Sequence, residues 1–175
     1  MTVASLGELA RQIVVMGVSG TGKSAIGKPL AERLGFAFIE GDTFHPESNI
    51  QKMSAGTPLD DDDRRPWLEL LATKLADNQS AGKGSVLACS ALRRSYRDIL
   101  RRGASDAYFL HLDLPFDVLI ERMEKREHFM PASLLQSQFD TLERLESDER
   151  GHVLDSDAPT PEVIEAAADA VLTAG

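Results

Sequence analysis

The sequence predicts an α/β fold, in which a mainly parallel sheet of five strands is sandwiched by helices. Short apolar runs alternate with segments of helical periodicity, and this alternation is typical of a parallel sheet with helices on both faces. No internal repeat or low-complexity linker interrupts the pattern, and 175 residues are the length of one ordinary domain. We therefore interpret residues 1–175 as a single domain.

Five segments are expected to be strands. The run Ile13–Met16 is apolar and rich in β-branched residues, and it stops at Gly17, which is typical of a buried strand. The other four strands are expected at residues 36–39, 85–89, 108–112 and 152–155. Ligands of such sheets bind beyond the carboxyl ends of the strands, so functional residues are expected there.

Helical spacing first occurs at Lys23–Leu34, where apolar residues recur four positions apart and Gly35 is expected to end the helix. Pro29 falls inside this helix, and proline in such a position can kink it. Further helices are expected at residues 49–55, 66–78, 95–102, 116–125, 132–143 and 161–172. Residues 43–84 form a long insert between the second and third strands.

Composition excludes several classes of function. The formal net charge of −9 argues against a nucleic-acid surface, because phosphate backbones are bound by clustered Lys and Arg. No apolar run approaches the roughly 18 residues that cross a bilayer, and residues 1–12 do not resemble a secretory signal. The single cysteine, Cys89, excludes an intramolecular disulfide and fits a reducing compartment. We expect a cytoplasmic protein that does not bind nucleic acid or membranes.

A glycine-rich loop follows the first strand. Residues 17–24 read GVSGTGKS and match the phosphate-binding pattern G-x-x-x-x-G-K-[ST] in full. The glycines let successive backbone N–H groups point at phosphate oxygens, while Lys23 should reach the β- and γ-phosphates and Ser24 should bind Mg²⁺. The expected nucleotide-binding residues are Gly17, Ser19, Gly20, Thr21, Gly22, Lys23, Ser24 and Ala25. The alternative is a chance glycine-rich turn, but the strand before it and the helix after it favour a P-loop NTPase fold.

Two carboxylates follow the second strand. Glu40 and Asp42 are expected to project at its carboxyl end and face the phosphate loop. Phosphoryl transfer to an alcohol needs a carboxylate that accepts the hydroxyl proton, and it commonly needs acidic help in holding Mg²⁺. We assign Asp42 as the catalytic base and Glu40 to the metal site. The alternative is that both are solvated turn residues.

Further motifs follow in a fixed order after the loop. They are Gly41-Asp42, His45-Pro46, Asn49-Ile50, Lys52-Met53, Gly56-Thr57-Pro58-Leu59, Asp61-Asp62-Asp63-Arg64, Pro66-Trp67-Leu68, Cys89-Ser90-Ala91-Leu92, Tyr96-Arg97-Asp98, His128-Phe129-Met130, Gln138-Phe139 and Thr141-Leu142-Glu143. With the loop they cover about residues 13–155, and the chain resembles the bacterial-type gluconate kinases. It departs from that family in having Glu40 where Asp is common, and one residue rather than two between Arg126 and His128.

The resemblance implies transfer of the γ-phosphoryl group of ATP to the 6-hydroxyl of D-gluconate, with Mg²⁺ as cofactor. It also implies the architecture of the small kinases related to shikimate kinase, with a substrate-binding insert at about residues 43–84 and a mobile lid at about residues 122–140. A homodimer is suggested only by analogy with the family.

A sugar acid needs cationic donors for its carboxylate and polar groups for its hydroxyls. Arg64 is our candidate for the carboxylate, since a guanidinium can grip it through two parallel hydrogen bonds; the alternative is that Arg64 only offsets the acidic run 60–63. His45 is a candidate hydrogen-bond donor or, alternatively, a turn residue. Ser90, Ala91 and Leu92 follow the third predicted strand, and this strand-end position assigns them to the lining of the substrate site. Lys52 and His128 are assigned to the substrate site on the resemblance.

Arg122 and Arg126 are four residues apart and therefore share one helix face. The resemblance makes them lid arginines, with Arg122 contacting ATP and Arg126 stabilising charge on the transferring phosphoryl group. Neighbouring glutamates allow the alternative of a salt-bridged surface helix. Two other functions remain open: a kinase for shikimate or a nucleoside monophosphate, and a nucleotide-dependent switch without catalysis.

Overall fold

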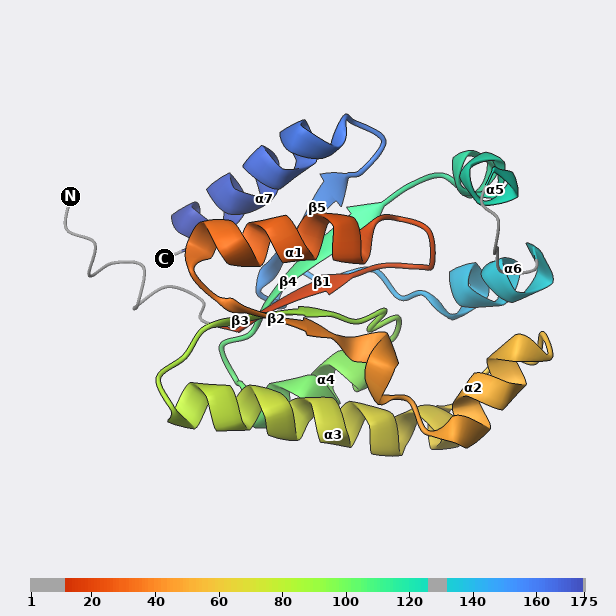
Figure 1. The fold of residues 1–175 in the computed structure, drawn as a ribbon, viewed down its shortest axis with the longest axis horizontal. Helices are drawn as coiled ribbons and strands as arrows, with labels where there is room; N and C mark the ends of the chain where they lie inside the picture. The colour runs from red at the N-terminus through yellow and green to blue at the C-terminus, as the bar shows by residue number, and fades with distance from the viewer. Residues whose placement is uncertain (1–11, 126–131, 175) are drawn as a thin grey trace.

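The computed structural model describes residues 12–125 and 132–174. Its strands form one parallel five-stranded sheet with the order β2-β3-β1-β4-β5, which confirms the predicted fold class (Figure 1). In that sheet β1 lies at the centre, so that Ile13 is opposite Val86 on one side and Tyr108 on the other. The strands are β1 (Gln12–Met16), β2 (Ala37–Glu40), β3 (Ser85–Ala88), β4 (Tyr108–Asp113) and β5 (Gly151–Asp155).

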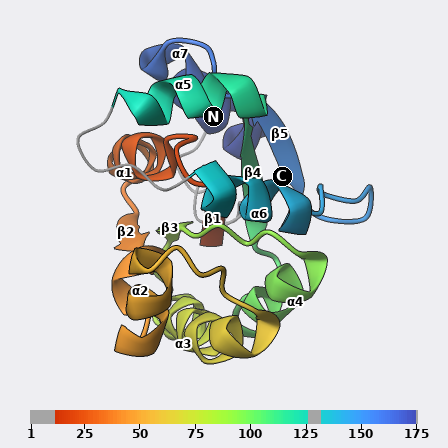
Figure 2. The same ribbon diagram turned by 90° about the vertical axis from the view of Figure 1, so that its right-hand side faces the viewer.

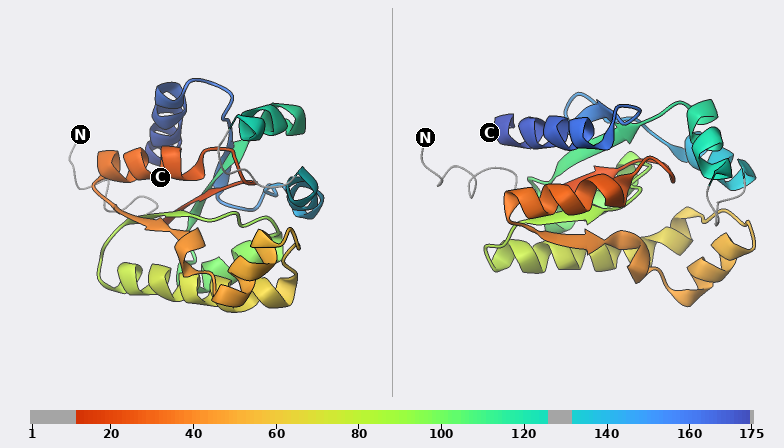
Figure 3. Two further views of the ribbon diagram at one scale, coloured as in Figure 1. Left: turned by 45° about the vertical axis from the view of Figure 1, so that its right-hand side comes forward. Right: turned by 45° about the horizontal axis from the view of Figure 1, so that its top comes forward.

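Helices cover both faces of the sheet (Figures 1 and 3). One face packs against α1 (Lys23–Leu34) and α7 (Thr160–Thr173), and the other packs against α3 (Asp61–Ser80) and α4 (Arg94–Gly103). Three further helices gather around the end of the molecule toward which the strands point (Figure 2). They are α2 (Glu47–Ser54), α5 (Phe116–Glu124) and α6 (Ala132–Thr141).

The sequence of β1 shows why this strand is central. Ile13 and Val15 belong to the core beneath α1 and α7, whereas Val14 and Met16 belong to the core beneath α3 and α4. All four side chains are fully buried. A strand that is covered on both faces is expected to be continuously apolar rather than alternating. No helix within residues 12–125 and 132–174 is long and apolar enough to cross a membrane.

The largest error in the predicted helix bounds is at the start of α3. We expected a helix from Pro66, whereas α3 begins at Asp61, five residues earlier. The Asp60 side chain accepts a hydrogen bond from the Asp63 backbone N–H at 2.7 Å, and the Asp63 carboxylate accepts one from the Asp60 N–H at 3.0 Å. This capping box starts the helix. The acidic side chains in the first turn further stabilise it, because they lie at the positive end of the helix dipole. The acidic run is therefore the helix start rather than a loop before it.

The predicted bounds of α1 are confirmed. The helix ends at Leu34, and the next residue, Gly35, adopts a left-handed conformation with φ 73°. Pro29 lies inside a continuous helix. A short 3₁₀ turn, η2 (Gly41–Phe44), was not expected. It follows β2 directly and determines where the predicted catalytic carboxylate lies.

His111 in β4 predicts a pH dependence of stability. Its side chain is 1% exposed, and Nδ1 has no hydrogen-bond partner among the described residues. Burial lowers the pKa of His111 to about 4; Asp113 raises this pKa, and Arg144 and Arg97 lower it. The imidazole therefore stays neutral in the folded protein at a pH where the unfolded chain binds a proton.

This contribution to stability is fully present above pH 6.5 and is lost as the pH falls toward 4. We expect the free energy of unfolding of the wild type to fall, between pH 7 and pH 4, by about 3 kcal/mol more than that of His111→Phe. Urea denaturation of both proteins at several pH values measures the difference. If the free energy of unfolding changed equally with pH in the two proteins, the low pKa of His111 would be contradicted.

Candidate active site

The phosphate loop, residues 17–24, joins β1 to α1 at the carboxyl end of the sheet. Its glycines are required by geometry, since Gly17, Gly20 and Gly22 have φ values of 145°, 88° and 93°. A Cβ atom on Gly17 would lie 2.7 Å from the Leu112 carbonyl oxygen. The buried Thr21 hydroxyl donates to the Val18 carbonyl at 2.9 Å and closes the loop internally. The loop is thus a preformed turn.

Lys23 carries the positive charge of this loop. Its ammonium group donates to the carbonyl oxygens of Gly17 at 3.0 Å and Val18 at 3.1 Å. Burial lowers the pKa of Lys23, while the nearby Asp42, Cys89 and Glu40 raise it. Its carbonyl partners are weaker acceptors than an anionic oxygen, so the ammonium group favours a phosphate ligand.

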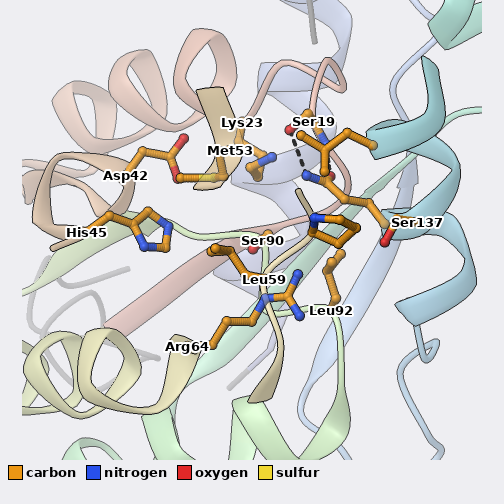
Figure 4. A pocket seen from close by; sticks show the side chains of 13 residues that line it. Ser19, Lys23, Asp42, His45, Met53, Leu59, Arg64, Ser90, Leu92 and Ser137 are labelled. Atoms are coloured by element: carbon orange, nitrogen blue, oxygen red, sulfur yellow. Dashed lines mark hydrogen bonds between the residues drawn. The ribbon is translucent and has the colours of Figure 1, made fainter. Parts of the chain in front are cut away.

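The two predicted carboxylates lie where β2 ends. The Ser24 hydroxyl at the start of α1 donates to the Glu40 carboxylate. Gly41 packs so closely on β3 that a Cβ atom there would be 2.4 Å from the Ala88 carbonyl, and its own carbonyl accepts from Trp67 Nε1 at 2.8 Å. These contacts fix η2, and Asp42 within it faces the same space as Lys23 (Figure 4).

His45 is held flat against Trp67. The ring centroids are 3.9 Å apart with an interplanar angle of 18°. Asn49 Nδ2 lies 2.9 Å from the Asp63 carbonyl and 3.2 Å from His45 Nδ1. An amide nitrogen can only donate, so Nδ1 is the acceptor and Nε2 carries the proton. Burial lowers the pKa of His45, the Asp42 charge raises it and Arg64 lowers it, which favours a neutral donor facing the pocket.

Arg64 is a buried cation that is hydrogen-bonded to a tyrosine hydroxyl. It is 8% exposed, and its guanidinium donates to the Tyr96 hydroxyl at 3.0 Å. Tyr96 in turn donates to Asp61 at 2.5 Å. Within the described part of the chain, no carboxylate forms an ion pair with Arg64. A buried charge is costly unless it is paired, so this arrangement favours an anionic ligand.

These side chains surround one pocket of about 160 Å³ (Figure 4). Seven residues that the sequence assigned to nucleotide or substrate line it: Ser19, Lys23, Asp42, His45, Arg64, Ser90 and Leu92. Six further lining residues had been given no role: Met53, Pro58, Leu59, Leu134, Ser137 and Gln138. Four of the six stood within recognised motifs, which was the signal that could have assigned them. Leu134 and Ser137 had no such signal.

Several assigned residues lie outside this pocket. Lys52 pairs with Asp63 at 2.8 Å. Ala91 is fully buried and has a positive φ of 45°, so only its backbone shapes the loop after β3. Ala25 is exposed in the first turn of α1. Arg122 lies 3.4 Å from the Ser156 carbonyl and 3.5 Å from Asp157. Arg126 and His128 lie outside the described residues.

Comparison with known proteins defines the family. A model described as shikimate kinase matches residues 19–168. A gluconokinase from Gluconobacter oxydans is 52% identical over 145 residues, which cover 82% of each chain. The crystal structure of a sugar kinase from Janibacter has a TM-score of 0.88 at 52% identity, and covers 91% of this chain and 93% of that one. A gluconokinase structure from Sinorhizobium meliloti has a TM-score of 0.86 at 47% identity, with 93% and 92% covered. The chain belongs to the gluconokinase family, within the wider group of kinases that the shikimate kinase model describes.

Proposed function

We propose that the protein transfers the γ-phosphoryl group of ATP to the 6-hydroxyl of D-gluconate, giving 6-phosphogluconate and ADP. The observation that carries this proposal is the buried Arg64 guanidinium, which forms no ion pair with the described carboxylates and lies in the same pocket as Lys23 and Asp42. A pocket with a cation for a carboxylate, a lysine for phosphates and a carboxylate for a hydroxyl matches the three chemical groups of the reaction. The gluconokinase relatives support the same acceptor.

In this proposal gluconate spans the pocket. Its carboxylate pairs with Arg64 through parallel hydrogen bonds, and its hydroxyls accept from His45 and contact Ser90. Its 6-hydroxyl then lies beside Asp42, which accepts the proton as the phosphoryl group is transferred. The apolar lining side chains of Met53, Leu59, Leu92 and Leu134 limit water around the reacting groups and so limit ATP hydrolysis.

Ser24 and Glu40 fit a magnesium ion shared with the nucleotide. A hydroxyl and a carboxylate oxygen are hard ligands, and Mg²⁺ commonly takes only one or two protein ligands besides water and phosphate. Among the described residues, no group of three or more His, Cys, Asp or Glu side chains is placed to hold a metal ion. Bound there, the ion would neutralise phosphate charge.

The same proposal assigns Arg122 to ATP and places the protein in the cytoplasm. Arg122 is half-buried, and its contacts to described residues are long ones to Ser156 and Asp157, so it can turn to a nucleotide. Burial raises the pKa of the Cys89 thiol to about 12, which makes it an inert core residue rather than a redox group. A buried free thiol and a dependence on ATP both fit a reducing compartment.

Coupled ADP release tests the proposed function. With Mg-ATP as donor, we expect turnover with D-gluconate and none above background with shikimate or AMP. Turnover with another acceptor would replace gluconate. ATP binding without stimulation by any of the three would favour a nucleotide-dependent switch.

Arg64→Lys tests the grip on the carboxylate. A lysine keeps the charge but loses the paired donors, so we expect the KM for gluconate to rise by roughly 10–100-fold, with the KM for ATP almost unchanged. Arg65→Lys is the matched control, because the neighbouring Arg65 is exposed and pairs with the exposed Asp62 at 3.7 Å. Equal effects on both KM values would contradict a specific contact with gluconate.

A further inference from the structure

Gln138 links α6 to the phosphate loop. Its Oε1 accepts a hydrogen bond from the Ser19 backbone N–H at 2.8 Å, and its Nε2 donates to the Ser19 hydroxyl at 3.2 Å. Both bonds are partly buried and join residues that are 119 positions apart. One amide therefore satisfies both the backbone donor and the side chain of a single loop residue.

The bond to the Ser19 N–H has a direct counterpart in nucleotide binding. Backbone N–H groups of a phosphate loop are donors for phosphate oxygens. In this structure the carbonyl oxygen of Gln138 takes the position of such an acceptor at Ser19. A γ-phosphate oxygen carries more negative charge than an amide carbonyl and makes the stronger hydrogen bond, so it can displace Gln138 from the N–H.

The position of Ser19 identifies which phosphate is concerned. Ser19 and Gln138 line the same pocket as Lys23 and Asp42. In the proposed function, Asp42 is the residue that meets the acceptor hydroxyl. The phosphate nearest to that hydroxyl is the transferring γ-phosphate. A displaced Gln138 would remain beside this group, because its helix is anchored by the buried Leu134 and Leu135. Its amide NH₂ could then donate to the γ-phosphate instead of to Ser19.

We propose that Gln138 is a γ-phosphate contact, which binds Ser19 in the nucleotide-free protein and exchanges that bond for the γ-phosphate of ATP. The inference rests on the proposed use of ATP and adds a residue that distinguishes ATP from ADP. Discrimination arises because ADP has no group at the position next to Gln138 and therefore neither gains nor loses from this side chain.

Calorimetric binding of ADP and of the β,γ-imido analogue of ATP, both with Mg²⁺, tests the proposal. In Gln138→Glu the new carboxylate lies next to the γ-phosphate, and we expect affinity for the analogue to fall by roughly 10-fold or more and affinity for ADP by less than about 3-fold. Gln138→Leu removes both the bonds to Ser19 in the nucleotide-free protein and the proposed donor to the γ-phosphate. Because the bond to the charged phosphate is the stronger, we expect a net loss of roughly 3–10-fold for the analogue alone. Gln136 lies exposed on the same helix and bonds to Asp140, so Gln136→Glu and Gln136→Leu are matched controls that should change neither affinity.

Equal loss for the two nucleotides, or no loss for either, would overturn the role of Gln138. Retained ADP binding shows that each variant is folded, so a structural failure cannot imitate the expected pattern. The binding experiment contains no gluconate. Its outcome is therefore separate from that of the turnover assay. If Gln138 discriminates ATP from ADP but the protein does not phosphorylate gluconate, the γ-phosphate contact stands and the proposed acceptor is wrong.

Discussion

Replacing Asp42 by Asn is expected to lower kcat with gluconate by roughly 10²–10⁴-fold, the usual contribution of a positioned general base. The amide has almost the same shape as the carboxylate and can still accept a hydrogen bond from the 6-hydroxyl, but it cannot take the proton. Asp42 is an exposed residue of η2, and the turn is fixed by the packing of Gly41 and by a backbone hydrogen bond from the His45 N–H to the Asp42 carbonyl, which the substitution keeps. The variant should therefore fold normally.

The measurement is steady-state ADP release over a range of gluconate and ATP concentrations. We expect the loss in kcat, with the KM for ATP changed by less than about 3-fold, because the contact with the hydroxyl forms part of the reaction rather than of nucleotide binding. Asp106→Asn, at an exposed turn before β4, is the control for a lost surface charge. A variant with more than a fifth of wild-type kcat would rule out Asp42 as the base.

Replacing Arg97 by Met is expected to lower the free energy of unfolding by about 3–5 kcal/mol. Arg97 and Glu149 have fully buried side chains, joined by hydrogen bonds of 2.7 Å from Nε and 3.0 Å from the guanidinium NH₂ group. A third bond of 2.9 Å goes to the Ala91 carbonyl. Burial alone would raise the pKa of Glu149, yet hydrogen bonds from Arg97, the Glu146 backbone and Arg101 hold it at about 2. Loss of Arg97 leaves a buried carboxylate that has lost its bidentate partner.

Urea denaturation of three variants isolates this effect. Arg97→Met combined with Glu149→Leu removes both charges and should recover much of the stability lost in the single variant. Arg94→Met is the control on the same helix. Because Arg94 pairs with Asp148 at the surface, its replacement should lower the free energy of unfolding by no more than about 1 kcal/mol. A single variant as stable as the control would show that the buried pair contributes little.

Because Arg97 holds Ala91 between Ser90 and Leu92, we also expect weaker gluconate binding in Arg97→Met.

Local signals in the sequence were sufficient for the sheet and the phosphate loop. The apolar run of β1 and the glycines beside Lys23 determine the backbone conformation of their own segments. The structure of these segments could therefore be predicted without knowing the rest of the fold. A local signal also gave a wrong prediction, because Pro66 indicated the first residue of a helix that in fact begins at Asp61. The capping pair Asp60 and Asp63 lies only a few residues upstream, but its geometry is decided by both side chains together.

Contacts between distant segments could not be predicted. Nothing in the spacing indicates that Gln138 would reach Ser19, or that Tyr96 would hold Arg64. Lys52 is a different case, because this cation in the insert at residues 43–84 was assigned to the substrate and the structure pairs it with Asp63 outside the pocket; its role in substrate binding stays a prediction. Residue type and motif identified the charges of the site, but tertiary packing decided which of them face the pocket.

The strand order has a consequence for how the chain folds during synthesis. The first two strands do not pair with each other: β1 pairs with β3 and β4, and β2 pairs with β3. Within residues 12–84, therefore, no hydrogen-bonded strand pair can form, and the first ladder must wait for Ser85–Ala88. Pairings between segments so far apart in sequence close large loops and are slow. A nascent chain that ends before β3 has emerged should carry helices but no sheet, and its phosphate loop should become a binding site only once β3 is in place.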